Sequence, residues 1–393
     1  MTGWSGPLGE ALAALIDHRG KTPKKLGTDW VDDGVRVLSA LHVKGGRLQA
    51  EPQRFVPRDV YDRWMPEKLQ AGDVLLTSEA PLGEVAYLSE SVEACLGQRL
   101  FGLRPKPEVL DSRYLFYLLQ HSSLRSQLLQ RSSGTTVAGI RQAELVRVAL
   151  ELPPLDHQRR VANALGSFDD LLENNRRRIE ILEEMARLLY REWFVHFRFP
   201  GHEDVEVVDS ELGPIPDGWE VVQLRDVVML SYGKALKADD RNGGPVEVYG
   251  SGGVVGHHDT FLTEGPGIVV GRKGNVGALF WSDADFFPID TTYYVETDLP
   301  LHFVYQLLGT LTFIDSHAAV PGLSRDQAYD LRVVVPSAIQ AQQYEERVTP
   351  NVQLRRNLIE QNRVLREARG LLLPRLVSGE LDVSELDLDG VLA

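Results

Sequence analysis

The sequence contains a single cysteine, Cys95, and no uninterrupted apolar run of about 18 residues. One thiol can form neither a disulfide framework nor a cysteine-rich zinc site, so we interpret Cys95 as a small buried apolar residue. The start of the chain has no basic stretch followed by an apolar one, so we expect neither a signal peptide nor a membrane span. These absences favour a soluble, cytoplasmic protein without a metal site.

The motifs of several enzyme classes are also missing. No Gly-x-x-x-x-Gly-Lys-Ser/Thr sequence is present, which argues against P-loop nucleotide hydrolysis. The Pro153-Pro154 pair follows Leu152 and not Asn or Asp, so an adenine methyltransferase motif of the Asn-Pro-Pro-aromatic type is absent. No lysine has an acidic residue two positions before it, which removes a common signature of metal-dependent nucleases. Together these absences predict a chain that recognises a ligand and has no catalytic residues.

An excess of basic residues is missing as well. The net charge is −14, and the acidic excess lies almost entirely in residues 201–336. No long segment is strongly basic. Any contact with phosphate groups must therefore come from local clusters of Lys and Arg, or from a partner subunit.

The sequence does contain an internal repeat, which organises the whole chain. Sliding the sequence along itself aligns Gly139 with Gly322 and Pro153 with Pro336. Each copy then runs in the same order: a glycine, a short strand that stops at a proline, a glutamine-bearing segment and a long helix. The strands are expected at 145–152 and 331–335, because both are rich in β-forming residues.

The two helices are expected at 154–197 and 337–377. In the first, apolar residues recur at alternating steps of three and four, with Asn175 filling one slot. The second begins less regularly, and we place Pro350 at the first helical position with Thr349 as the N-cap, after a short separate helix. The heptad pattern favours an antiparallel coiled coil, although two unrelated surface helices are the alternative. The expected pairing residues are Leu172, Ile179, Leu182, Leu189, Leu358, Leu365 and Leu372.

A globular segment precedes each helix, at 1–153 and at 198–336, and a C-terminal tail is expected at 378–393. Both segments contain a glycine-punctuated strand-turn-strand pattern, at 72–86 and at 267–280. We therefore predict an α+β fold with two mixed α/β domains, two long helices between them and a pseudo-two-fold internal repeat.

Local basic clusters recur in turn-prone stretches of both copies. Glycines allow a backbone to approach a ligand closely, and cations between them suit phosphate groups or base edges. An ordinary solvated turn is the alternative for each cluster. The candidate DNA-contacting residues are Arg19, Lys21, Lys24 and Lys25 in the first copy, and Lys234, Lys237, Arg241, Arg272, Lys273 and Asn275 in the second.

With these features in order, the chain resembles the specificity subunits of type I restriction–modification systems over nearly its whole length. Each matching stretch is loose by itself, but their order, which occurs twice, is specific. The stretches are 134–140, 152–158, 213–220, 224–227, 267–277, 287–294 and 371–381.

The resemblance implies that each globular segment is a target-recognition domain for one half of a split, asymmetric sequence in double-stranded DNA. The helices would set the gap between the halves and bind two modification subunits, which use S-adenosylmethionine to methylate adenine. Separate restriction subunits would use ATP and Mg²⁺ to translocate and cut DNA. A helix of about 30 residues spans roughly 45 Å, or about 13 base pairs.

Two other functions stay open on the sequence alone. One is the specificity subunit of a type II-like enzyme, which cleaves without translocation. The other is a DNA-independent scaffold that uses the coiled coil to join proteins, which the acidic second segment favours.

Overall fold

The computed structural model describes residues 3–134, 137–313 and 322–383. The chain forms two compact units. Unit 1 comprises Met1–Glu173 and Asn362–Ala393, and unit 2 comprises Asn174–Gln361. The two long helices, α6 (Leu155–Tyr190) and α9 (Ala338–Val377), each contribute one part to each unit. The predicted repeat of mixed α/β domains with long helices is therefore confirmed.

Unit 1 contains a four-stranded antiparallel sheet in the order β2-β10-β7-β8. Its strands are β2 (Leu12–Asp17), β7 (Val74–Thr77), β8 (Val85–Tyr87) and β10 (Leu100–Pro105). A smaller sheet has the order β6-β3-β9, in which β3 and β9 are parallel. Its strands are β3 (Val35–Leu38), β6 (Phe55–Val56) and β9 (Ala94–Leu96). The first strand, β1 (Trp4–Pro7), pairs with β11 (Ala149–Leu152), directly before α6.

Unit 2 repeats the order of these three sheets. Each unit also has one strand pair without a counterpart: β4 (Val43–Lys44) with β5 (Arg47–Leu48) in unit 1, and β12 (Val207–Ser210) with β13 (Gly213–Pro216) in unit 2. Its four-stranded antiparallel sheet has the order β15-β21-β18-β19. The strands are β15 (Met229–Tyr232), β18 (Gly267–Gly271), β19 (Leu279–Ser282) and β21 (Thr292–Glu296). The smaller sheet, β17-β16-β20, again contains one parallel pair and consists of β16 (Val246–Gly250), β17 (Gly253–His258) and β20 (Phe286–Pro288). Here β14 (Glu220–Gln223) pairs with β22 (Arg332–Val335), directly before α9.

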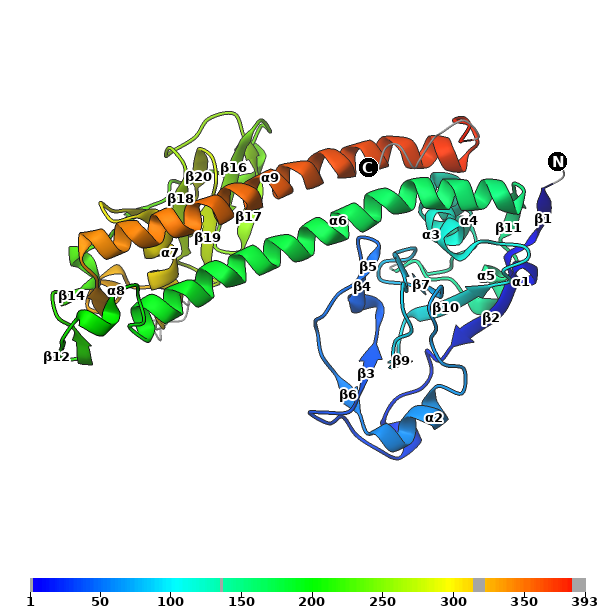
Figure 1. The fold of residues 1–393 in the computed structure, drawn as a ribbon. Helices are drawn as coiled ribbons and strands as arrows, with labels where there is room; N and C mark the ends of the chain where they lie inside the picture. The colour runs from blue at the N-terminus through cyan, green and yellow to red at the C-terminus, as the bar shows by residue number, and fades with distance from the viewer. Residues whose placement is uncertain (1–2, 135–136, 314–321, 384–393) are drawn as a thin grey trace. The chain divides into compact units, whose positions relative to one another are not determined.

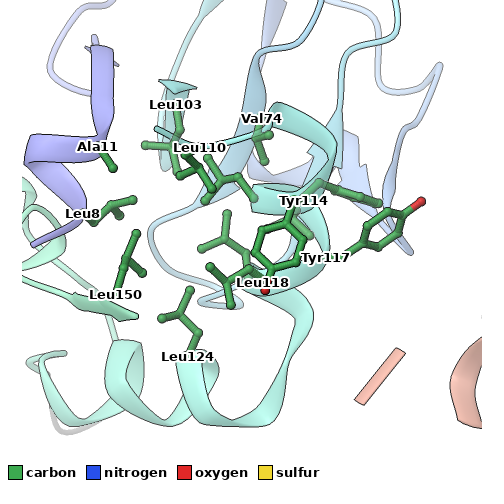
Figure 2. Packing of buried hydrophobic residues seen from close by; sticks show 14 of the residues in the cluster. Leu8, Ala11, Val74, Leu103, Leu110, Tyr114, Tyr117, Leu118, Leu124 and Leu150 are labelled. Carbon is green, nitrogen blue, oxygen red and sulfur yellow. The ribbon is translucent and has the colours of Figure 1, made fainter. Parts of the chain in front are cut away.

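Helices cover one face of each large sheet (Figure 1). In unit 1, α3 (Ser112–Gln120) presents Tyr114 and Leu118 to the core that also contains residues of α1 (Leu8–Ala11), β7 and β10 (Figure 2). The Tyr117 hydroxyl donates to the Asp169 carboxylate of α6 at 2.7 Å. The N-cap of α3 is Asp111, whose carboxylate accepts the backbone N–H of Tyr114 at 2.8 Å. The next helix, α4 (Ser122–Gln130), adds Leu124 and Leu128 to the same core. In unit 2, α7 (Leu301–Thr310) takes the place of α3.

The long helices pack against each other within unit 2, in antiparallel orientation. Asn175 donates to Gln361 at 2.8 Å, Arg355 pairs with Glu183 at 2.7 Å, and the Tyr344 hydroxyl donates to the carbonyl of Ala186 at 2.9 Å. Residue numbers therefore rise along α6 as they fall along α9. In unit 1, Arg369 of α9 pairs with Asp169 of α6 at 2.7 Å.

The second helix does not begin at Pro350, so that prediction was wrong. One continuous helix runs through Pro350, and the residues before it are anchored by Ala341, Tyr344 and Val348, which are buried in the core of unit 2. Pro350 has no N–H to offer the carbonyl of Glu346, but Thr349 donates its hydroxyl to the carbonyl of Glu345 at 2.6 Å. Burial of the flanking turns therefore outweighs the local helix-breaking effect of proline.

This arrangement makes Pro350→Ala a stabilising substitution. Pro350 is exposed, so alanine loses no packing and restores one helical hydrogen bond. We expect the free energy of unfolding to rise by about 1–3 kcal/mol, measured by denaturant unfolding. Gly370→Ala at an open, exposed position of the same helix is the comparison, with an expected gain of about 1 kcal/mol. An unchanged or lower stability for Pro350→Ala would contradict this account.

Three smaller differences concern element ends. The strand expected at 145–152 covers only Ala149–Leu152, because a short helix, α5 (Gln142–Leu145), precedes it. The first long helix, expected to reach 197, ends at Tyr190 and continues as one π-helical turn, Arg191–Val195. In the expected tail, Val383 is buried in the core of unit 1, while residues 384–393 lie outside the described residues.

Candidate nucleic-acid interface

In each unit, equivalent hydrogen bonds hold the turn that follows one strand of the large sheet. This strand is β7 in unit 1 and β18 in unit 2. In unit 2, Arg272 N–H donates to the carbonyl of Thr291 at 2.9 Å, and Leu323 N–H donates to the carbonyl of Arg272 at 2.7 Å. In unit 1, Ser78 N–H donates to Arg99 and Ile140 N–H donates to Ser78, both at 2.9 Å.

Each of these turns also forms one β-bridge to the segment that contains the glycine aligned by the sequence repeat. Glu79 bridges Gly139, and Lys273 bridges Gly322. The repeat seen in the sequence is thus also a repeat of backbone pairing. It makes Ser78 the counterpart of Arg272 and Glu79 the counterpart of Lys273.

The turn of unit 2 places two arginines around one tyrosine ring. The Arg272 guanidinium lies 4.9 Å from the centre of the Tyr232 ring and donates to the carbonyl of Asp290 at 2.9 Å. Arg325, on the other segment of the bridge, lies 5.0 Å from the same ring. Tyr293 packs beside Tyr232, and burial raises the pKa of Tyr293 to about 12, so its phenol stays neutral. The result is a cationic and aromatic cluster that carries no negative charge of its own.

The glycines of this turn allow a close approach of two backbone segments. A Cβ at Gly271 would lie 2.0 Å from the carbonyl oxygen of Asn275, and Gly274 has a φ of +83°. A Cβ at Gly274 would lie 3.3 Å from the Ser251 hydroxyl, so the turn meets the tight turn between β16 and β17. Lys273 and Asn275 are exposed at this place, as a ligand-contacting turn requires.

The other predicted residues of unit 2 divide into two groups. Lys234 is exposed, and its backbone N–H donates to the carbonyl of Pro288 at 3.0 Å. Pro288 lies two residues before Asp290, whose carbonyl accepts the hydrogen bond from Arg272. Lys237 is exposed further along the same loop as Lys234. Arg241 is held by the protein itself, since its guanidinium donates to the carbonyls of Val255 and Leu236 at 2.7 and 3.3 Å.

In unit 1 much of the predicted positive charge is likewise bound internally. Arg19 forms two 2.8 Å hydrogen bonds with Asp17 and lies 4.0 Å from the centre of the Phe101 ring. Lys21 donates to the carbonyls of Arg63 and Trp64 at 3.0 and 2.5 Å, and burial lowers the pKa of Lys21.

The remaining two lysines lie in the next turn of the chain. Lys25 donates to the carbonyl of Gly20 at 2.8 Å, whereas the exposed Lys24 has no acceptor among the described residues. Lys21, Lys24 and Lys25 therefore do not join Arg19 at the sheet turn.

Three arginines that the sequence analysis did not select complete the two turns. In unit 1, Arg99 and Arg141 line a cavity of about 350 Å³ together with Arg19. Arg99 adopts a φ of +65°, in the left-handed region that non-glycine residues rarely occupy, and pairs with Glu79 at 3.1 Å. The third is Arg325. The sequence repeat could have pointed to Arg141 and Arg325 as candidates, because they closely follow the aligned Gly139 and Gly322. No sequence pattern marks Arg99.

The predicted helix-pairing residues lie on the buried or partly buried side of their helices. Leu172, Leu182 and Leu358 are buried. Leu189 packs against the core of unit 2, and Leu372 packs against that of unit 1. Ile179 and Leu365 are partly buried. That these residues act as a coiled-coil seam stays a prediction.

The described residues also bear on metal binding, membrane insertion and thiol reactivity. They contain no group of three or more His, Cys, Asp and Glu side chains that could hold a metal ion. No helix in the described ranges is long and apolar enough to cross a membrane. Cys95 is buried, and this burial raises the pKa of its thiol to about 12, so the thiol stays protonated at neutral pH.

The chain belongs to the family described as type I restriction modification DNA specificity domain, which matches residues 13–184 and 216–342. Most of both globular segments and most of α6 are therefore covered. The match leaves out residues 343–377, which make up nearly all of α9.

Individual relatives extend this result. The chain is 28% identical over 354 residues to the type I restriction enzyme MjaIX specificity subunit of Methanocaldococcus jannaschii, covering 80% of this chain and 79% of that protein. It is 20% identical over 160 residues to the EcoKI specificity subunit of Escherichia coli, covering 40% of this chain and 34% of that one. Its fold is similar to the crystal structure of the S subunit from M. genitalium, with a TM-score of 0.58 and 19% identity over 95% of each chain.

Proposed function

We propose that this chain is the non-catalytic subunit that selects the DNA target of a type I restriction–modification complex, and that each unit reads one half of a two-part sequence. Two modification subunits would supply S-adenosylmethionine and the methyl transfer. Restriction subunits would supply ATP-dependent, Mg²⁺-dependent translocation and cleavage. The family and the named relatives support the class of complex, and the duplicated turn supports the division of labour.

The duplicated turn is the observation on which the proposal depends. In both units the segment after the aligned glycine joins the turn of the large sheet, and arginines gather there. Two similar readers in one chain suit two separate DNA segments. They suit an asymmetric target in particular, because Ser78 and Glu79 of unit 1 stand where unit 2 has Arg272 and Lys273.

The acidic net charge fits a reader that depends on partners for affinity. A net charge of −14 disfavours tight binding of the isolated chain to DNA, since phosphate contacts dominate affinity. Base recognition needs only a few well-placed donors. We therefore expect the isolated chain to bind DNA weakly and the complex with modification subunits to bind it specifically.

Co-expression with the modification subunit, followed by mapping of methylated adenines, tests the proposal. A two-part motif with a fixed gap is the expected result. Methylation at a single continuous motif would overturn the two-reader arrangement. A reconstituted complex that retains no double-stranded DNA would favour the scaffold function that the acidic second unit suggests. Methylation together with cleavage close to the target, without translocation, would instead identify a type II-like enzyme.

A second prediction concerns the gap itself. Seven residues inserted into α6 between Glu173 and Asn174, and seven into α9 between Gln361 and Asn362, leave the contacts inside each unit intact. We expect the gap in the methylated motif to widen by about 3 base pairs, because seven helical residues add about 10 Å. The same insertion between the exposed Asp32 and Asp33 should leave the gap unchanged. An unaltered gap after the paired helix insertions would show that the helices do not set the spacing.

A further inference from the structure

Two guanidinium groups flank one tyrosine ring in unit 2. The centre of the Tyr232 ring lies 4.9 Å from the Arg272 guanidinium carbon and 5.0 Å from that of Arg325. Arg272 comes from the turn after β18, and Arg325 is the first residue of α8 (Arg325–Tyr329). Tyr232 is 49% exposed, so the cluster lies at the surface. Three separate segments of the chain therefore converge to hold two cations in fixed orientations.

Arg325 makes few polar contacts for a positioned arginine. Its guanidinium packs over Tyr232 and, at 5.9 Å, over Tyr329. Its Nε is buried and has no hydrogen-bond partner among the described residues, and no carboxylate in the described ranges pairs with it. Aromatic faces fix the plane of the group, and its two terminal nitrogens have no hydrogen-bond partner among the described residues, which is the arrangement that bidentate recognition needs.

The neighbouring Arg225 shows the contrast. It also lies 5.9 Å from the Tyr329 ring, but its guanidinium forms an ion pair with Asp330. The charge of Arg225 is therefore neutralised within the protein, whereas that of Arg325 is not.

We propose that Arg325, supported by Arg272, reads a guanine in the half-site that unit 2 recognises. This inference rests on the proposed function and adds the chemical identity of one base. Guanine presents O6 and N7 side by side in the major groove, and a planar guanidinium is the side chain that matches both acceptors. A phosphate contact would need charge but not this fixed plane.

Unit 1 lacks the pair. The hydrogen bonds that align the two units make Ser78 the counterpart of Arg272 and Gln142 the counterpart of Arg325, and Gln142 likewise begins its short helix. The guanine contact therefore belongs to one half-site only, and changes in Arg325 affect that half alone.

The test uses the complex with its modification subunits and duplexes that carry the mapped target. Each guanine of the target is replaced in turn by 7-deazaguanine, which lacks the N7 acceptor, or by hypoxanthine, which keeps both O6 and N7. At one guanine in one half-site, 7-deazaguanine is expected to weaken binding about tenfold and hypoxanthine to leave it nearly unchanged. With Arg325→Lys, binding to the native duplex falls about tenfold to a hundredfold, and the 7-deazaguanine effect at that position disappears.

The matched control is Arg225→Lys, which changes the same side chain beside the same Tyr329 ring and should retain the full 7-deazaguanine effect. Thermal unfolding of each variant shows whether unit 2 stays folded. If Arg325→Lys weakens all duplexes equally, Arg325 contacts a phosphate and the proposal is wrong. It is also wrong if Arg325→Lys binds like the unmodified complex. If the unmodified complex shows no two-part target at all, the proposed function fails before this inference is reached.

Discussion

Replacing Arg104 by alanine is expected to lower the free energy of unfolding of unit 1 by about 3–5 kcal/mol. Arg104, on β10, donates to both carboxylate oxygens of Asp73 at 2.8 and 2.9 Å and to the carbonyl of Lys68 at 2.6 Å. The Asp73 side chain is fully buried, and its hydrogen bonds raise the pKa of Arg104. Alanine would leave a buried carboxylate whose remaining donor is the backbone N–H of Gln70 at 2.8 Å.

The comparison is Arg58→Ala, which removes an ion pair to Glu93 on the same unit. Both partners there are more than half exposed, and we expect a change within about 1 kcal/mol. The double variant Asp73→Ala, Arg104→Ala should recover part of the loss, because no uncompensated charge remains. Denaturant unfolding of all three variants measures these differences. A loss for Arg104→Ala no greater than that for Arg58→Ala would show that the buried pair contributes little.

In unit 2 the largest expected loss follows Phe194→Ala, about 3–5 kcal/mol. Phe194 lies in the π-helical turn after α6, and its ring packs at centroid distances of 5.0 Å from Phe303, 5.1 Å from Tyr190 and 5.3 Å from Tyr344. This cluster joins the end of α6 to α7 and to the start of α9. Its removal leaves a cavity where three helices meet, and large aromatic deletions are costly because such sites collapse only in part.

Tyr344→Phe is the matched control for the aromatic cluster. It keeps the ring and removes only the hydroxyl that donates to the carbonyl of Ala186, so we expect a loss of about 1 kcal/mol. Tryptophan fluorescence during denaturant unfolding reports the change through Trp193 and Trp219, which lie in the same core. Equal effects of Phe194→Ala and Tyr344→Phe would mean that the hydroxyl, and not ring packing, holds this junction.

The sequence predicted the repeated parts of the fold well because their signals are local. The strand-turn-strand patterns at 72–86 and 267–280 correspond to β7-β8 and β18-β19, and both long helices are present. The failures have physical causes. Pro350 predicts a helix start by local rules, but buried residues on both sides carry the helix through it. Residues 145–148 were assigned to a strand, whereas Leu145 ends a short helix and Val148 is buried before the strand begins.

The candidate interface was only partly predictable, because a sequence shows where charges are and not which acceptors they meet. Lys21 and Arg241 look available in the sequence, yet backbone carbonyls occupy their donors. Arg325 appeared unremarkable because its significance depends on Tyr232 and Arg272, which lie far from it in the chain. The bridge between Lys273 and Gly322 and the hydrogen bond from Leu323 N–H to the carbonyl of Arg272 bring these segments together.

The sequence by itself determined the duplication, the order of elements in each copy and the family. Those properties follow from patterns within short windows and from their recurrence. The tertiary structure alone decided which cations are neutralised and which stay available, and where proline is tolerated inside a helix. Those outcomes depend on burial and on contacts between segments far apart in the chain, whose free energies exceed the local preferences of any single residue.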